Sequence, residues 1–244
     1  MGFFLGFLGL NPVRLYRKLF AFYGPQGWWP VSNRRFGKAT YAKREKLNRH
    51  QQLEVCVGSI LAQNTAWSNA AKAIERLKQD RLLDLETLAT CSQARLANCI
   101  RSAGFFNQKA LRLKLFCRHV LKRDGSISVL LNQPVEDLRS ELVSLHGIGP
   151  ETCDSMMLYA GQKPVFVVDA YTLRLVDRLY ALRLDYAAGQ AFFQSSLPDK
   201  AGLFNEFHGL IVEHSKAFCR SKPDCKGCFL KKNCKWGQKS ESGK

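Results

Sequence analysis

The stretch that decides the fold reads Leu145-His146-Gly147-Ile148-Gly149-Pro150-Glu151-Thr152. It lies between two segments in which apolar residues recur at helical spacing, so Gly-Ile-Gly predicts a tight turn between two helices. The second helix can begin at Pro150, because a proline in the first turn costs no hydrogen bond. Two glycines within three residues let backbone N–H groups approach a phosphate, with a helix N-terminus behind them. The turn is therefore a candidate phosphate-binding hairpin.

A single carboxylate follows this hairpin at the end of an apolar run. Residues 164–168 read Pro-Val-Phe-Val-Val, and Asp169 comes directly after them. Asp169 also precedes a segment with helical spacing, where an aspartate usually caps the helix by accepting backbone hydrogen bonds. Two interpretations stay open at this point: a helix cap, or a carboxylate that does chemistry on a ligand held by the hairpin.

The charge of the chain is strongly positive. Its 244 residues include 37 Lys and Arg against 20 Asp and Glu, a formal net charge of +17. Such a charge favours a polyanionic partner, either nucleic acid or an anionic membrane surface, over a merely soluble basic protein. No apolar stretch is long enough to span a bilayer. Residues 1–10 are apolar without the features of a signal peptide, and we expect a packing segment or a start-site extension there.

The spacing of apolar residues predicts an all-α fold. Helical spacing is present over residues 11–23, 53–61, 70–77, 85–88, 93–100, 107–121, 134–145, 151–159, 170–180 and 203–218. No strand-like alternation of any length is present. Residues 32–49 carry many basic side chains without apolar periodicity, which predicts a solvated loop that is inert or contacts a DNA backbone.

Four of the nine cysteines lie within sixteen residues near the C-terminus. Their spacing is C-x5-C-x2-C-x5-C, formed by Cys219, Cys225, Cys228 and Cys234. Four thiolates can bind either zinc or an iron–sulfur cluster. Zinc sites usually pair two tight C-x2-4-C motifs, whereas here one close pair lies between two wider arms, so we favour a [4Fe–4S] cluster over zinc.

Two adjacent tryptophans, Trp28 and Trp29, precede Pro30 in a predicted loop. Indole rings are costly to leave in water, so they either fill the edge of a core or line a pocket in which they stack on a base. The residues alone do not decide between these two roles.

Several blocks together resemble the helix-hairpin-helix/Gly-Pro-Asp DNA glycosylases, and among them the endonuclease III-related 3-methyladenine DNA glycosylase branch with an iron–sulfur cluster loop. These blocks are residues 23–30, 61–67, 101–109, 147–152, 166–172 and 205–214, with the cysteine loop 219–234. The resemblance implies a two-lobed fold in which residues 50–162 form a six-helix barrel with the hairpin. Residues 11–49 and 163–235 would form a discontinuous second lobe that carries the cluster, and residues 236–244 a flexible tail.

The resemblance also implies residue roles. Asp169 takes the position of the catalytic aspartate, and Glu151 stands where relatives that also cut the strand place a lysine. Such a lysine forms a Schiff base with the sugar, which a glutamate cannot do. Lys109 or Lys216 is the remaining candidate for that amine.

Further residues take family positions at the DNA and the base. Gln63 would lie on the loop that enters the duplex where the base is extruded. The residues expected to contact DNA are Gln63, Gly147, Ile148, Gly149 and Thr152. Those expected at the base pocket are Trp28, Trp29, Pro30 and Lys216, although Lys216 can equally be a surface lysine.

We therefore predict a monofunctional DNA N-glycosylase that flips out alkylated purines of the 3-methyladenine type and leaves an abasic site. One alternative is an endonuclease III-like glycosylase and lyase for oxidised pyrimidines, and another is a non-catalytic DNA-binding protein. The expected partner is double-stranded DNA with damaged bases, and we expect no membrane association. We expect a monomer in the cytoplasm at the nucleoid of a bacterial or archaeal cell.

Overall fold

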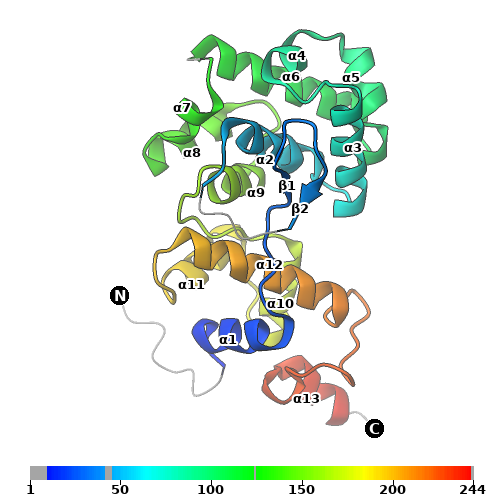
Figure 1. Ribbon diagram of the computed structural model, residues 1–244. Helices are drawn as coiled ribbons and strands as arrows, with labels where there is room; N and C mark the ends of the chain where they lie inside the picture. The colour runs from blue at the N-terminus through cyan, green and yellow to red at the C-terminus, as the bar shows by residue number, and fades with distance from the viewer. Residues whose placement is uncertain (1–9, 42–45, 124, 243–244) are drawn as a thin grey trace. The chain divides into compact units, whose positions relative to one another are not determined.

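A computed structural model of the chain describes residues 10–41, 46–123 and 125–242 (Figure 1). The apolar segment expected to pack at the N-terminus lies outside the described residues, apart from the buried Leu10. Most of the described part is helical and its two strands have only two residues each, which confirms the all-α class. None of its helices combines the length and the apolar character that a membrane span requires.

Contacts within the chain divide it into two compact units. The continuous unit is Gly27–Lys163, and the discontinuous unit combines the described residues up to Gln26 with those from Pro164 onward. The division expected from the sequence assigns residues 27–49 to the second lobe. In the structure the described residues of this range belong to the continuous unit, because the buried Val31 lies on strand β1 (Val31–Ser32), which packs on helix α2 (Arg49–Leu61).

Helix α2 is the centre of the continuous unit. Its residues from Leu53 to Leu61 are all buried, as expected for a helix surrounded by other helices. It contacts α3, α6, α7 and α9, and the side chains of Asn48 and Gln51 form a capping box at its start. The other helices of this unit are α3 (Trp67–Gln79), α4 (Leu85–Thr90), α5 (Gln93–Cys99), α6 (Phe106–Arg123), α7 (Ile127–Leu131), α8 (Val135–Ser144) and α9 (Pro150–Ser155), which continues as the π-helical turn Met156–Ala160.

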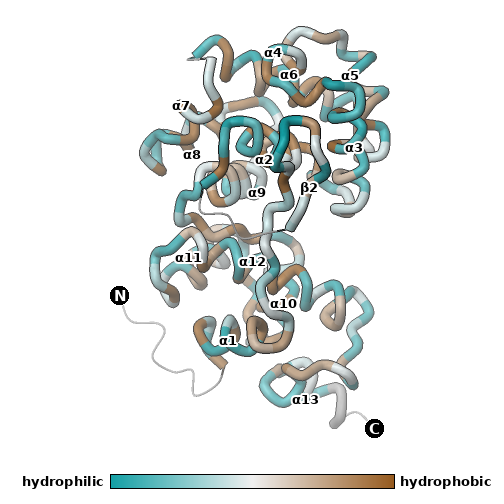
Figure 2. Tube along the Cα trace, in the orientation of Figure 1, coloured by the Kyte–Doolittle hydropathy of each residue, from teal (hydrophilic) through white to brown (hydrophobic). Residues whose placement is uncertain are grey.

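The discontinuous unit packs around α12 (Ala201–Ala217), which contacts α1 (Pro12–Tyr23) and α10 (Ala170–Tyr180). Its core is aromatic: the rings of Phe166 and Phe193 stack with centroids 4.3 Å apart, and Phe207 meets both edge-on. Two more helices are α11 (Tyr186–Gln194) and α13 (Lys235–Ser242). Figure 2 shows hydrophobic and hydrophilic residues alternating along the helices of each unit, as amphipathic helices require.

The structure corrects several expectations. The predicted solvated loop 32–49 contains part of a short ribbon, in which β1 pairs antiparallel with β2 (Ala39–Thr40). The buried Glu54 on α2 accepts the Ser32 N–H and so ties β1 to that helix. Helices α7 and α11 were not predicted. The expected flexible tail 236–244 begins inside α13, where the Gly237 N–H contacts the Cys234 thiol at 3.4 Å.

Candidate functional site

The hairpin joins α8 to α9, as the sequence predicts, but its two glycines differ in their surroundings. Gly147 has φ of +79°, a conformation that other residues rarely adopt, and a Cβ there would lie 2.2 Å from Nε of Arg112. Gly149 has φ of −88° and open space around its Cα. Backbone geometry therefore requires glycine at position 147, whereas Gly149 leaves room at the N-terminus of α9.

The side chain of Gln63 is bound to this hairpin. Its Nε2 donates to the Gly147 carbonyl at 2.9 Å and to the Thr152 hydroxyl at 2.8 Å. Its Oε1 accepts from Nη1 of Arg112 at 2.6 Å. Gln63 thus joins the end of α2 to the turn of the hairpin, to α9 and, through Arg112, to α6. The sequence did not indicate these links.

We predict that Gly147→Ala destabilises the continuous unit. A positive φ and a Cβ against Arg112 are expected to cost about 1–3 kcal/mol, because Arg112 must also leave Gln63. Urea unfolding measures the effect, with Gly149→Ala as the matched control that should unfold with the wild-type midpoint. Equal stability of the two variants would contradict this account of the turn.

Glu151 and Lys109 are the two residues of this unit whose side chains matter for the predicted absence of strand cutting, and they differ in exposure. Glu151 is exposed in the first turn of α9, where a negative side chain stabilises the helix dipole. Lys109 is only 1% exposed, and its Nζ donates to the carbonyls of Leu61 and Ala103 at 2.8 and 2.7 Å. Burial lowers the pKa of Lys109 to about 8, and nearby Arg112 adds to this effect. Lys109 holds the end of α2 and is enclosed by backbone.

The paired tryptophans form an aromatic cluster within the continuous unit. Trp29 is buried, with its ring over Gly58 and edge-on to Trp67 and Tyr159 at 4.8 and 5.2 Å. Trp28 is half-buried and lies edge-on to Trp67 at 5.1 Å. The two tryptophans therefore differ. Trp29 fills the core, whereas Trp28 is partly exposed at the edge of the core and is the candidate for a residue that stacks on a base.

Two further aromatic residues extend this cluster. The Tyr41 ring lies 5.5 Å from the Trp28 ring, and its hydroxyl accepts a hydrogen bond from Trp67 Nε1 at 2.9 Å. Pro30, which directly follows Trp29 in the sequence, is also buried. Lys216 belongs to the discontinuous unit, where it is exposed on α12, so its assignment to the pocket stays a prediction.

Asp169 caps α10 and is also set up for chemistry. Its Oδ1 accepts from the Thr172 N–H at 2.7 Å and from the Thr172 hydroxyl at 2.9 Å, while Oδ2 lies 3.5 Å from Nε2 of His208. Burial by itself raises the pKa of the Asp169 carboxyl, but His208 and Thr172 outweigh burial, so the pKa lies below its ordinary value. At neutral pH, Asp169 is an ionised carboxylate in a largely buried place.

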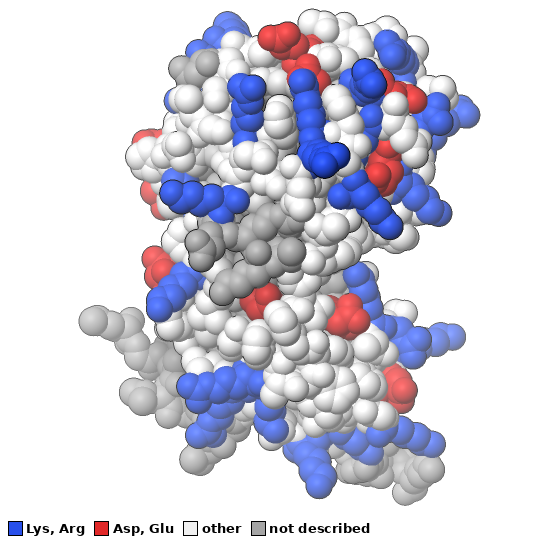
Figure 3. All heavy atoms as spheres, viewed as in Figure 1, with Lys and Arg blue, Asp and Glu red and all other residues white. Residues whose placement is uncertain are grey.

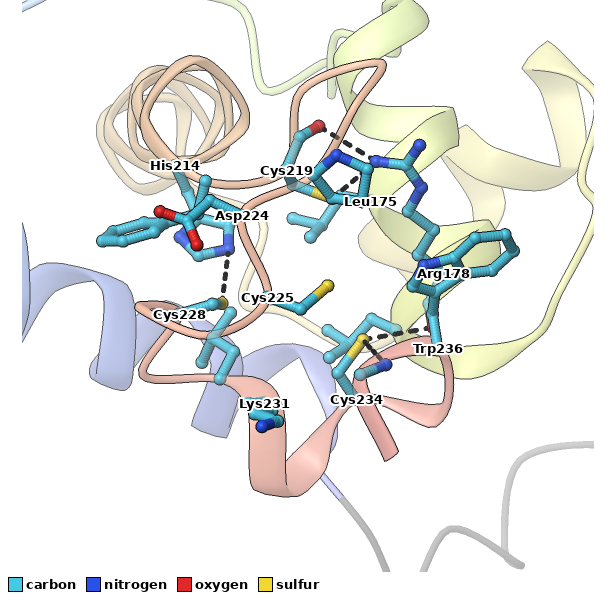
Figure 4. A pocket seen from close by; sticks show the side chains of 15 residues that line it. Leu175, Arg178, His214, Cys219, Asp224, Cys225, Cys228, Lys231, Cys234 and Trp236 are labelled. Atoms are coloured by element: carbon cyan, nitrogen blue, oxygen red, sulfur yellow. Dashed lines mark hydrogen bonds between the residues drawn. The ribbon is translucent and has the colours of Figure 1, made fainter. Parts of the chain in front are cut away.

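The four cysteines of the C-terminal loop line one pocket of about 370 Å³, part of it open to solvent (Figure 4). Burial raises the pKa of the Cys228 thiol to about 11 and also raises that of Cys234. Among the described residues, no three His, Cys, Asp or Glu side chains converge closely enough to hold a single metal ion.

Two arginines of α10 hold the cysteine loop. Nε of Arg174 donates to the Cys219 carbonyl at 2.8 Å, and Arg178 donates to the carbonyls of Arg220 and Ser221 at 2.5 and 3.0 Å. Nη1 of Arg178 also lies 3.5 Å from Sγ of Cys219. Helix α10 thus carries Asp169 at its start and fixes the cysteine loop along its length.

On the face in Figure 3, lysine and arginine side chains are more frequent than acidic ones, in keeping with a polyanionic partner. Sequence reasoning missed three polar neighbours of the predicted residues: Arg112 beside Gln63, His208 beside Asp169, and Arg178 beside Cys219. Each lies on a helix remote in sequence from its partner, and helical spacing alone does not reveal such pairs.

The sequence of this chain matches a known protein family and several individual proteins. Residues 57–194 match the family described as HhH-GPD superfamily base excision DNA repair protein. A protein named as a DNA repair glycosylase in Methanocaldococcus jannaschii is 37% identical over 225 residues, which cover 91% of this chain and 94% of that protein. Endonuclease III of Thermotoga maritima is 27% identical over 192 residues, covering 78% of this chain and 85% of that protein.

A solved structure also resembles this chain. The crystal structure of the H. pylori 3-methyladenine DNA glycosylase bound to 1,N6-ethenoadenine matches with a TM-score of 0.70 and 28% identity, covering 85% of this chain and 98% of that one. The match confirms the predicted glycosylase fold. The family match spans the hairpin, Asp169 and α10.

Proposed function

Because the chain belongs to the HhH-GPD superfamily of base excision DNA repair proteins, as the sequence predicts, we propose that it is a DNA N-glycosylase that excises alkylated purines and leaves an abasic site. The observation that carries this proposal is Asp169, a mostly buried carboxylate whose pKa is held below its ordinary value by His208 and Thr172 against the effect of burial. Membership of this family confirms the prediction of a DNA repair glycosylase.

Asp169 would act through electrostatics. Cleavage of an N-glycosidic bond develops positive charge on the sugar, and a preorganised carboxylate stabilises that charge more than water does. Oδ1 is engaged by Thr172, so Oδ2 is the oxygen available to face the sugar and to direct a water molecule. A 3-methyladenine-type base is already cationic, so its departure needs little help from an acid.

The amines near the hairpin support the proposal that the strand is not cut. Schiff-base formation needs an accessible, deprotonated amine close to the sugar. Glu151 supplies no amine at the hairpin, and the amine of Lys109 is buried against two carbonyls. These two positions therefore favour a reaction that ends at base release. Lys216, exposed on α12, is the remaining candidate amine, and the borohydride experiment below tests it.

The aromatic cluster supports a planar, electron-poor base as the substrate. Trp28 lies at the edge of a group of rings that includes Trp67 and Tyr41. Indole faces attract cationic rings by about 0.5–2 kcal/mol beyond ordinary stacking. This is the chemistry that would favour an alkylated purine over an undamaged one.

DNA would bind at the hairpin, where the N–H groups at the start of α9 can meet a phosphate. For Gln63 to enter the duplex, its hydrogen bonds to Gly147, Thr152 and Arg112 must be exchanged for contacts with bases. Flipping costs a few kcal/mol, part of which a side chain in the gap offsets.

A panel of duplexes, each with one lesion, tests the reaction. We expect a duplex that contains 1,N6-ethenoadenine or a methylated purine to lose the base and to break only after alkali. Borohydride should trap no covalent protein–DNA adduct. Strand breaks without alkali, together with a trapped adduct, would contradict the proposal.

The second candidate is a glycosylase and lyase for oxidised pyrimidines, which the likeness to the Thermotoga maritima endonuclease III favours. Thymine glycol in the same panel distinguishes the two. Release of thymine glycol in preference to alkylated purines would support this second function.

We also infer that the cysteine loop holds a [4Fe–4S] cluster, whose thiolate-ligated iron would serve to fold the loop. Cys219, Cys225, Cys228 and Cys234 would be the ligands. Their convergence on one pocket supports a site with four thiolate ligands, and the C-x5-C-x2-C-x5-C spacing favours a cluster over zinc. Arg178 and the Gly237 N–H would meet thiolate sulfurs. Purified protein should be brown and contain iron and acid-labile sulfide, whereas zinc without iron would contradict this assignment.

A further inference from the structure

His208 lies at the oxygen of Asp169 that Thr172 leaves available, and the mechanism described so far does not use it. It lies on α12, which packs against α10. Its Nε2 is 3.5 Å from Oδ2 of Asp169, and the side chains are only 11% and 14% exposed. Because buried polar side chains normally have hydrogen-bonding partners, the placement of this histidine beside a buried carboxylate indicates that the two side chains interact.

The two oxygens of Asp169 are held in different ways. Thr172 donates two hydrogen bonds to Oδ1, and these fix that oxygen at the start of α10. They leave the plane of the carboxylate free to tilt about Oδ1, since terminal torsions of aspartate are broad. A tilt would move Oδ2, the oxygen that must face the sugar.

We propose that His208 is a positioning residue, whose Nε2–H holds Oδ2 of Asp169 in place and favours its ionised form. The inference rests on the proposed function, in which Asp169 stabilises the developing charge. His208 itself touches neither the sugar nor the base in this scheme. It acts through Asp169, and the role needs only the donor at Nε2.

The charged surroundings agree with this role. Burial pushes the pKa of Asp169 upward, and His208 is the ionisable side chain that faces it from α12, while Thr172 contributes hydrogen bonds from α10. Two other ionisable residues of the helices in this unit have different partners. Glu206, also on α12, accepts the Gln26 N–H at 2.5 Å. Tyr16 on α1 packs edge-on against Phe207, at 5.4 Å between the ring centroids.

Kinetics test the positioning role. We expect His208→Leu to lower the single-turnover rate of base release by on the order of 10²-fold, as small displacements of a catalytic group do, with little change in DNA affinity. The acid limb of the pH–rate profile should move to higher pH. His208→Gln keeps a donor and should stay within an order of magnitude of wild type, with the acid limb in place.

His119→Leu is the matched control. It removes another histidine–carboxylate pair, in which Nε2 of His119 lies 2.7 Å from Oε1 of Glu141 in the continuous unit. This variant should leave the rate of base release unchanged. If His208→Leu retains both the wild-type rate and the wild-type acid limb, the proposal is overturned. It is equally overturned if His208→Gln is as impaired as His208→Leu.

A measurement without substrate separates this inference from the proposed function. The carboxyl carbon of 13C-labelled Asp169, assigned by its absence in Asp169→Asn, reports the pKa directly by NMR. We expect a higher pKa in His208→Leu than in wild type or His208→Gln. That result would support the pairing even if no lesion were excised, and an unchanged pKa would overturn it.

Discussion

Asp169→Asn is expected to lower the rate of base release by on the order of 10³-fold or more, while the protein stays folded and binds DNA. A single preorganised group that faces developing charge is worth roughly 10²–10³-fold, and here a full negative charge is removed. Asparagine caps helices as well as aspartate does, so the bonds that Thr172 donates to Oδ1 can persist. The loss would therefore be one of chemistry.

Single-turnover release from a duplex with an alkylated purine measures this effect, with thermal unfolding and DNA affinity as companion readouts. Asp185→Asn is the matched control, because Asp185 caps α11 through the Ala188 N–H at 2.8 Å in the same unit. It should release the base at the wild-type rate. An Asp169→Asn variant with undiminished release would remove Asp169 from the mechanism.

The sequence predicted the elements of this site better than their contacts. The hairpin was predictable because Gly147 and Pro150 are local signals, and a cap at Asp169 because it precedes a helical pattern. Helix α11 was missed, because its short sequence, YAAGQAFFQ, has a small polar face. The ribbon at residues 31–40 was missed because its two strands have only two residues each, too few for alternation to show.

Contacts between distant segments needed the structure. His208 and Asp169 are 39 positions apart, and the resemblance to glycosylases assigned a role only to Asp169. For Gln63, too, the resemblance predicted only a role at the DNA and no contact within the protein. Its bonds to Gly147 and Thr152 depend on how α2 packs beside α9. Such packing is a property of the whole core, which no local pattern encodes.

A second large effect is expected from a buried ion pair in the continuous unit. Nζ of Lys78 lies 2.7 Å from Oε1 of Glu54, and the two side chains are 1% and 3% exposed. Glu54 also accepts the Ser32 N–H at 3.2 Å, which fixes β1 directly after the Trp28-Trp29-Pro30 segment. The pair therefore anchors the part of the chain that carries the proposed base pocket.

We expect Lys78→Met to lower the free energy of unfolding by about 3–5 kcal/mol, because it leaves the charge of Glu54 buried without its partner. The double variant Glu54→Gln/Lys78→Met should recover much of this loss, since an amide carries no charge and can still accept the Ser32 N–H. Urea unfolding followed by tryptophan fluorescence measures both variants. Lys72→Met, at an exposed position on the same α3, is the control and should change stability by less than about 0.5 kcal/mol. If Lys78→Met unfolds like this control, Glu54 reaches water when its partner is lost, and the pair does not anchor the ribbon.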